Sequence, residues 1–261
     1  CQNVTSEGGS GGTIFITTKK QIPGHHFSSD TSLKSYFILQ LATLTESIKY
    51  SGFFFDNTFI NSSLKGTFAH NQYPFINYKN QNAVRKNNRI FDTNADLSLT
   101  TYTKNGNSLN IKDNFYYGNK EIPGTETSVN LSVQKDTDNL LSLGFTMPSL
   151  KDMFKINTNV SWQTLNQTYN SVKENSLHKL NTFTVQGNGT YFGSTFFEES
   201  LGLMVKSDFL NSTDAGNVNQ FSGFIKETTV LRPKDFINIT VPLSVNFNGA
   251  NFVFIPSIGV R

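Results

Sequence analysis

The sequence is poor in the features that usually stabilise a small protein or mark where it resides. Its single cysteine, Cys1, cannot form an internal disulfide, so the chain has no disulfide framework and its redox compartment cannot be deduced. No apolar run approaches the roughly 18 residues of a transmembrane helix. The first residues resemble neither the charged nor the apolar part of a signal peptide. We therefore expect Cys1 to be a cut end of a longer chain, with a lipid-modified N-terminal cysteine as the alternative.

Charge and hydrophobicity are also low. Charged residues make up 16% of the chain and hydrophobic residues 36%, against about 25% and 45–50% in typical soluble domains. Lys and Arg together number 22 and Asp and Glu 19, which leaves a net charge of only +3. Because this excess is small and the basic residues are scattered, we expect no nucleic-acid partner.

The chain is instead rich in aromatic and uncharged polar residues. It contains 24 Phe and 9 Tyr beside a single Trp, and 19 Gly. So many aromatic residues exclude an intrinsically disordered chain. Asn, Ser, Thr, Gly and Phe are poor or middling helix formers. The composition therefore predicts an all-β protein, either soluble or embedded in a membrane.

Apolar and polar residues alternate strictly in several segments. Residues 237–247 place an apolar side chain at every second position, residues 141–147 follow the same rule, and residues 109–115 follow it except at Asp113. We expect about twelve strands, several with the roughly 9–11 residues of a tilted membrane-spanning strand. Residues 129–133 fit either a further strand or an ordered loop. The expected strands lie near residues 36–41, 50–59, 64–70, 89–102, 109–115, 141–147, 154–162, 182–185, 201–205, 221–230, 237–247 and 252–260.

The expected connections alternate between short and long. Short turns are expected at residues 61–63, 104–107, 148–152, 193–194 and 232–235, and longer loops at residues 71–88, 118–139, 169–178 and 211–217. Short turns on one side and long loops on the other are typical of an antiparallel outer-membrane β-barrel. In such a barrel an apolar row faces lipid, a polar row faces a wet lumen, and every backbone group is paired between strands.

The segment Gly11-Gly12-Thr13-Ile14-Phe15-Ile16, followed by Thr17-Thr18-Lys19-Lys20, resembles the end of the plug domain in TonB-dependent outer-membrane receptors. In that family a Gly-Gly pair precedes a β-branched strand and then Thr-Lys. Phe15 stands where the family usually has Asn. Residues 71–75 and 115–124 also resemble the family, and they fall where its first extracellular loops lie.

This resemblance implies a plug followed by a barrel of about 22 strands. About twelve strands are roughly half of that number, so we expect an incomplete barrel. We expect residues 1–22 to be the C-terminal end of a plug, residues 23–32 a linker, and residues 33–261 the N-terminal half of the barrel. The chain also stops inside an expected strand, without the terminal aromatic residue that barrel assembly recognises.

The resemblance further implies a bacterial outer-membrane location and energised uptake of a scarce, bulky nutrient, either cobalamin or a ferric chelate. Its implied partners are outer-membrane lipid, the small-molecule cargo, and the TonB complex through the missing plug segment. The full-length protein is expected to be a monomer. The rival hypotheses are a passive or adhesive barrel without a plug and a soluble β-sandwich that binds carbohydrate.

Aromatic residues in the expected loops are the candidate ligand contacts: Tyr73, Phe75, Tyr78, Tyr116 and Tyr117. A basic cluster lies among the first three of them, in or beside the first long loop. It could attract an anionic chelate, or it could contact lipopolysaccharide or only solvent. It consists of Lys79, Arg85, Lys86 and Arg89.

No pattern indicates catalysis, a metal site or a cofactor. The four histidines have neither a helical His-x-x-x-His spacing nor a cysteine beside them. Glu198 and Glu199 are adjacent, so on a strand they point to opposite faces. Asp136 and Asp138 share a parity in an expected loop, where we expect solvation rather than calcium contact. No Gly-x-Ser-x-Gly or phosphate-binding Gly-Lys-Ser/Thr motif is present, so we expect no enzyme.

Overall fold

The computed structural model describes residues 2–3, 15–16, 24–36, 38–125, 131–150, 153–194, 196–234 and 237–260. All regular elements in these residues are β-strands. No helix in the described residues is long and apolar enough to cross a membrane. The all-β prediction is therefore confirmed.

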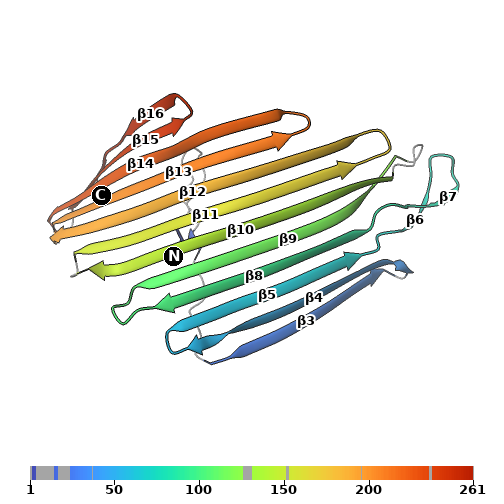
Figure 1. The fold of residues 1–261 in the computed structure, drawn as a ribbon, viewed down its shortest axis with the longest axis horizontal. Coiled ribbons are helices and arrows are strands. Elements are labelled where there is room, and N and C mark those ends of the chain that lie inside the picture. The colour runs from blue at the N-terminus through green and yellow to red at the C-terminus, as the bar shows by residue number, and fades with distance from the viewer. Residues whose placement is uncertain are drawn as a thin grey trace.

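One large antiparallel sheet contains nearly all of the described chain (Figure 1). Each strand pairs with the strand before it and the strand after it, except that β5 pairs with β8 across a loop that contains the small hairpin β6–β7. The strands of this sheet are β3 (His26–Tyr36), β4 (Ile38–Phe55), β5 (Thr58–Ala69), β8 (Ile90–Tyr102), β9 (Ser108–Pro123), β10 (Leu131–Leu150), β11 (Phe154–Asn170), β12 (Asn175–Ser194), β13 (Phe197–Ser212), β14 (Gly216–Lys234), β15 (Ile237–Asn248), β16 (Asn251–Pro256) and β17 (Gly259–Val260).

The sheet is open. Its path runs from β3 to β16, and these two strands lie at opposite margins of the sheet (Figure 1). β16 and β17 pair with successive parts of the same strand, β15, so they form one interrupted edge. The expected strand at residues 252–260 is therefore two pieces. An open, up-and-down path of long strands is the geometry of part of a barrel wall, so the prediction of an incomplete barrel is confirmed.

Several strands are longer than the sequence indicated. The expected loop at residues 118–139 is mostly strand, because β9 continues to Pro123 and β10 begins at Leu131. The loops expected at residues 169–178 and 211–217 shrink to residues 171–174 and 213–215. These predictions were wrong because long stretches of the strand ends, such as residues 118–121 and 134–139, are polar on both faces and show no apolar alternation. Backbone pairing between neighbouring strands holds them extended without it.

The N-terminal part of the sheet also differs from expectation. Residues 61–63, expected as a turn, lie inside β5, and the three strands expected in residues 36–70 are the two strands β4 and β5. Residues 26–32 of the expected linker belong to β3, which pairs with β4 along its length. The polar sequence of β3 concealed this strand. Strand β8, by contrast, matches the strand expected at residues 89–102.

The sheet is a single layer, so the described residues have almost no hydrophobic core. Ala69 is the only buried hydrophobic residue among them, while many large apolar side chains, such as Leu143 and Trp162, remain exposed. Contacts between strands run only between neighbours in a sheet. The described residues therefore contain no pair of sheets packed face to face, which is the packing that a β-sandwich requires.

One face of this sheet carries an apolar belt. Leu143, Val160, Val185 and Val205 lie directly opposite one another on four successive strands. An aromatic row borders the belt on the side of the longer connections, with Trp162 directly opposite Phe183. On the other side Phe154 contacts Tyr191, with ring centroids 4.9 Å apart. From Phe154 to Trp162, β11 has the length that a tilted strand needs to cross a membrane, roughly 9–11 residues.

Candidate functional site

The opposite face of the sheet is polar, and it carries the densest side-chain hydrogen bonding in the described chain. Successive residues on a strand point to opposite faces, so the positions between the apolar ones form this polar face. Ser142, for example, lies beside Leu143 in β10 and directly opposite Lys112 and Ser161. Ionisable, amide and hydroxyl side chains extend along it from β4 to β14.

Asp136 of β10 accepts hydrogen bonds from two strands on this face. Gln134 Nε2 lies 2.9 Å from each carboxylate oxygen of Asp136, and Gln167 Nε2 of β11 lies 3.0 Å from Oδ1. Lys120 Nζ of β9 stands 3.6 Å from Oδ2. Three neighbouring side chains therefore satisfy this half-buried carboxylate.

Asp138 and Asp96 are held in the same way. Gln163 Nε2 contacts both carboxylate oxygens of Asp138, at 3.0 and 2.9 Å. Asp96 accepts a hydrogen bond of 2.7 Å from the Ser63 hydroxyl and another from the side-chain amide of Asn114. Each of these contacts crosses from one strand to the next, so the network ties the strands together on their polar face.

Asp208 of β13 continues the network toward β12. The Thr182 hydroxyl lies 2.5 Å from Oδ1 of Asp208, and Lys206 Nζ lies 2.8 Å from Oδ2. The polar face thus pairs its acidic groups with amides, hydroxyls and lysines. It presents a continuous surface of further donors and acceptors, which suits water or another polar protein surface.

No group of three or more His, Cys, Asp or Glu residues that could hold a metal ion occurs in the described residues. His25 Nδ1 lies 2.9 Å from the Tyr50 hydroxyl, far along the sheet from His178. His178 contacts the Ser212 hydroxyl at 2.8 Å and lies 3.5 Å from an oxygen of Asp214.

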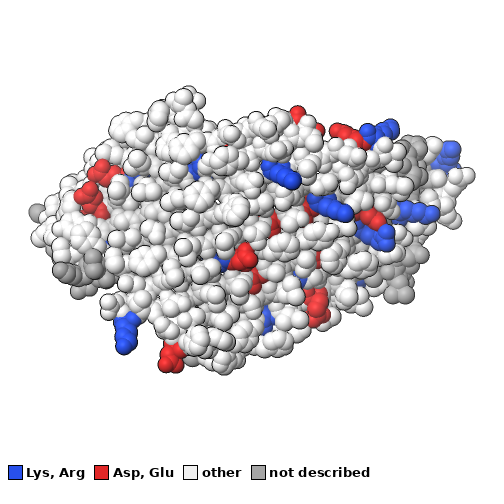
Figure 2. All heavy atoms as spheres, in the orientation of Figure 1, with Lys and Arg blue, Asp and Glu red and all other residues white. Residues whose placement is uncertain are grey.

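The first long loop, residues 70–89, contains β6 (Pro74–Ile76) and β7 (Asn82–Val84). Three of the predicted contacts, Tyr73, Phe75 and Tyr78, lie in this loop, and the rings of Tyr73 and Phe75 are 6.3 Å apart. Lys79 Nζ stands 5.5 Å from the centre of the Tyr78 ring. On the face shown in Figure 2, most Lys and Arg side chains lie in the right half, where Figure 1 places β6 and β7.

The other two predicted loop residues lie within β9. Tyr116 is directly opposite Asn94 and Asp138 on the polar face. Tyr117 points to the other face, where its ring centroid lies 6.2 Å from that of Phe91. The prediction that both are loop residues was wrong for the reason given above, and their opposite directions prevent them from contacting one ligand together.

Arg89, one of the four residues of the predicted basic cluster, is bound by Glu121 of β9. Its Nη2 and Nε lie 2.6 and 2.9 Å from Oε1 of Glu121, and its backbone N–H donates to Oε2 at 3.0 Å. These hydrogen bonds hold the pKa of Glu121 below its ordinary value and raise the pKa of Arg89. Lys79, Arg85 and Lys86 are the remaining cations of the loop, which contains no acidic residue.

The plug-like motif is described only in part. Phe15 and Ile16 form β2, which pairs with β1 (Gln2–Asn3). Four residues of the motif lie outside the described residues: Gly11, Gly12, Thr13 and Ile14.

The sequence-based prediction did not identify all residues of the polar face. It placed Asp136 and Asp138 in a loop, and it missed Gln163 and Gln167. The even numbering of the two aspartates beside the odd-numbered Leu141 and Leu143 was the available signal for them.

No family model matches the sequence, and no curated protein matches it. Solved structures do match the fold. The siderophore receptor PirA from Pseudomonas aeruginosa superposes with a TM-score of 0.70 at 9% identity, over 93% of this chain and 41% of that one. A G324V mutant of the ferric enterobactin receptor PfeA from Pseudomonas aeruginosa gives 0.68 at 8% identity, over 93% and 42%. FpvAI in its complex with pyocin S2 gives 0.53 at 9% identity, over 85% and 38%.

These similarities establish the fold: the chain has the architecture of part of an antiparallel β-barrel. It spans about two fifths of the length of the first two receptors, 41% and 42%. The structural resemblance expected from the glycine-rich segment is thereby confirmed at the level of the fold.

Proposed function

We propose that this chain is the end of the plug and the N-terminal half of the barrel of a TonB-dependent outer-membrane receptor. The single observation that carries the proposal is the match of 93% of the chain to part of a siderophore receptor. In this reading, residues 1–22 end the plug and the barrel wall begins at β3. The intact receptor takes up its cargo with energy transmitted by TonB.

The two faces of the sheet support a bacterial outer-membrane location. The apolar belt around Leu143 and Val160 faces lipid, and the aromatic rows at Trp162 and Phe154 lie at the two membrane interfaces. All backbone groups inside a bilayer must be paired, and the antiparallel ladders from β4 to β15 provide this pairing.

The polar face lines the lumen. Its satisfied carboxylates, such as Asp136 and Asp138, fix the side chains that meet the plug and ordered water. Pulling on the plug segment that is outside this chain opens a path along this face. Side-chain amides of the barrel wall already donate hydrogen bonds to its carboxylates. The plug can therefore move without leaving these carboxylates unpaired.

We favour a ferric chelate over cobalamin as cargo. Two of the similar receptors are named for siderophores, and the first long loop combines Tyr73, Phe75 and Tyr78 with three cations and no acidic residue. Such a loop attracts an anionic chelate more strongly than a neutral ligand. The loop captures the cargo and the barrel supplies no catalysis.

Uptake by the intact protein tests this function. Cells that express the full-length gene should accumulate ⁵⁵Fe from a ferric catecholate or hydroxamate chelate, and a protonophore or loss of TonB should abolish accumulation. Uptake of labelled cobalamin instead would contradict the preferred cargo. Passive entry that survives without TonB would favour the plugless barrel, and absence of the protein from outer-membrane fractions would contradict both barrel hypotheses.

A further inference from the structure

Glu227 of β14 places a carboxylate on the apolar face of the sheet. It lies directly opposite Leu201 of β13, and Leu201 is four positions from Val205 of the belt, so both point to the same face. On its other side Glu227 lies directly opposite Leu243 of β15. Its cross-strand neighbours on this face are therefore apolar side chains on both adjacent strands.

This carboxylate lies near the middle of the belt. On β14, the exposed residues Phe221 and Leu231 stand at the two ends of the outward row, six and four positions from Glu227. On β15, Leu243 is the central residue of the apolar row that runs from Ile239 to Phe247. A tilted strand crosses a membrane with roughly 9–11 residues, so a residue at this position is about half-way through it.

Glu227 forms no ion pair within the described ranges of the chain. The neighbouring cations Lys226 and Arg232 have even numbers and point to the polar face. Glu199, one row away on the apolar face, is itself negative. A charge on the lipid side of a barrel is most costly at mid-membrane, and a protonated carboxyl would still leave polar atoms without hydrogen bonds. In either state the side chain needs a polar partner that lipid tails do not supply.

An open space lies in the same row, on the other side of Leu201. Gly189 of β12 is directly opposite Leu201, and a Cβ atom at Gly189 would have no heavy atom within 4 Å. In membranes, small residues let a second protein segment approach the backbone closely, and polar residues hold the two segments together. Gly189, Leu201 and Glu227 combine both features in one row, which we name the Glu227 row.

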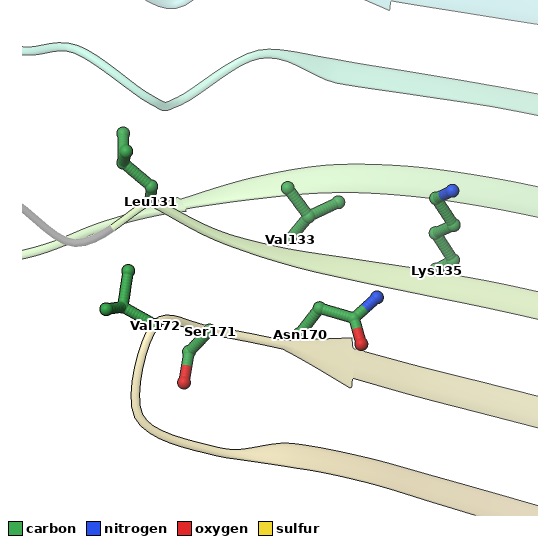
Figure 3. Close-up of a pocket in the computed structure, with 6 residues that line it drawn as sticks. All are labelled: Leu131, Val133, Lys135, Asn170, Ser171 and Val172. Atoms are coloured by element: carbon green, nitrogen blue, oxygen red, sulfur yellow. The ribbon is translucent and has the colours of Figure 1, made fainter.

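Neither lipid nor a second copy of this wall supplies a cation at the depth of Glu227. Charged headgroups lie at the interfaces, about 12 Å from the middle of an apolar band roughly 25 Å tall. In the described strands, the lysines of the apolar face are Lys135 of β10 and Lys179 of β12, and both lie beyond the aromatic row. Figure 3 shows Lys135 beside a hollow of about 390 Å³ at the ends of β10 and β11. The complementary cation therefore belongs to a different protein.

We propose that the Glu227 row is a contact surface, inside the membrane, for a second outer-membrane protein that carries a lysine or arginine at the same depth. The basic side chain pairs with Glu227, and the backbone of the partner lies over Gly189. Each charge is costly alone in lipid, so pairing favours the complex over the separate proteins. This inference rests on the membrane location in the proposed function, and the partner is distinct from the cargo and from TonB.

Site-specific photo-cross-linking of the full-length receptor in cells tests the proposal. The photoreactive amino acid benzoylphenylalanine replaces Leu201, which lies between Gly189 and Glu227, and in a second protein it replaces Leu143 as a lipid-facing reference. We expect one protein adduct at position 201, formed in a membrane-spanning segment that contains a lysine or arginine, and only lipid adducts at position 143. Glu227→Gln and Gly189→Leu should each lower the yield of the protein adduct about ten-fold.

The matched controls are Glu46→Gln and Gly66→Leu. These two residues lie directly opposite each other on the apolar face of β4 and β5. Glu46 already accepts hydrogen bonds from the Ser29 and Thr31 hydroxyls, and a Cβ atom at Gly66 would have its nearest neighbour at 4.0 Å. Both controls should leave the adduct unchanged. Glu227→Lys should abolish the adduct, and replacement of the partner's basic residue by glutamate should then restore it.

Three outcomes would overturn the proposal: only lipid adducts at position 201, a protein adduct whose membrane-spanning segment contains no basic residue, or an equal loss of adduct in the control variants. If the receptor is found in the outer membrane and transports iron but gives one of these results, only this inference fails. If the protein never enters the membrane, the proposed function fails with it.

Discussion

Asn139 donates a hydrogen bond of 2.9 Å from Nδ2 to Oδ1 of Asp113, on the apolar face of the sheet. Asp113 lies directly opposite Leu97 on one side and Leu141 on the other. It therefore places a carboxylate in the row of Trp162, at the border of the belt. In a membrane, a carboxylate at this height is tolerated because it is near the interface and has a hydrogen-bond donor.

Asn139→Leu should therefore destabilise the intact protein by about 1–3 kcal/mol, because it leaves the Asp113 carboxylate without its donor. The double variant with Asp113→Leu should recover most of this loss, since both polar groups are then replaced by apolar ones. Urea unfolding in detergent, followed by tryptophan fluorescence, measures both. A double variant that is less stable than Asn139→Leu alone would show that the pair is required for another reason.

Asp136→Leu should lower the free energy of unfolding by about 2–3 kcal/mol, and Gln167→Leu should lower it by only about 1 kcal/mol, in the same urea measurement. The aspartate is the common acceptor for Gln134 and Gln167 and has Lys120 close by. Removing it leaves several donors without a partner, whereas removing Gln167 leaves the carboxylate with its other contacts. Equal losses of unfolding free energy in the two variants would indicate that water molecules replace the lost side-chain hydrogen bonds.

The ion pair between Arg89 and Glu121 makes the stability of the first long loop depend on pH. The pKa of Glu121 is lowered in the folded protein, so its contribution is present above the unfolded pKa of about 4.3–4.5 and is lost as pH falls through the lower folded value. Amide hydrogen exchange of residues 85–89 should therefore show easier opening, relative to a pH-matched unfolded reference, as the pH is lowered from 6 to 3. Glu121→Gln should flatten this dependence, and an unchanged slope in that variant would assign it to another group.

Neighbouring residues in β10 should report the two environments of the wall. A spin label at Leu143→Cys should be relaxed mainly by molecular oxygen, because oxygen concentrates in lipid. A label at Ser142→Cys should be relaxed mainly by a water-soluble nickel chelate, because this position faces the polar side. The measurement uses the intact protein in vesicles, with other cysteines replaced by serine. If the nickel chelate relaxed the label at Leu143→Cys and oxygen relaxed the label at Ser142→Cys, the lipid-facing and lumen-facing sides of the sheet would be exchanged. Equal relaxation of the two labels by each reagent would contradict a sheet that lies in a membrane.

Gly223 lies where two neighbouring strands leave no room for a side chain. A Cβ atom there would clash with the Met204 carbonyl oxygen and stand 2.5 Å from Cζ of Phe247. Gly223→Ala should therefore destabilise the protein by about 1–3 kcal/mol. The control is Gly189→Ala, where nothing lies within 4 Å; it should be neutral or stabilise by up to about 1 kcal/mol. A similar loss in both variants would indicate that strand flexibility, not the clash, is responsible.

Part of this fold could be predicted because alternation is a local property. Wherever one face of a strand is apolar, as at residues 141–147, the sequence shows the period of two and the strand was expected correctly. Residues 118–121 of β9 and 134–139 of β10 could not be predicted as strand, because they are polar on both faces and owe their extension to pairing with neighbouring strands. The same limit explains why Tyr116, Tyr117, Asp136 and Asp138 were assigned to a loop.

The amino-acid sequence alone determined that the chain is all-β, that its strands have one apolar and one polar face, and that it resembles the start of a plugged barrel, because these follow from composition and short-range pattern. The tertiary structure decided which residues meet across strands. It bound Asp136 to Gln167, separated Tyr116 from Tyr117, and placed Lys135 and Lys179 on one surface. These arrangements depend on strand register, and register arises only when distant segments of the chain pair.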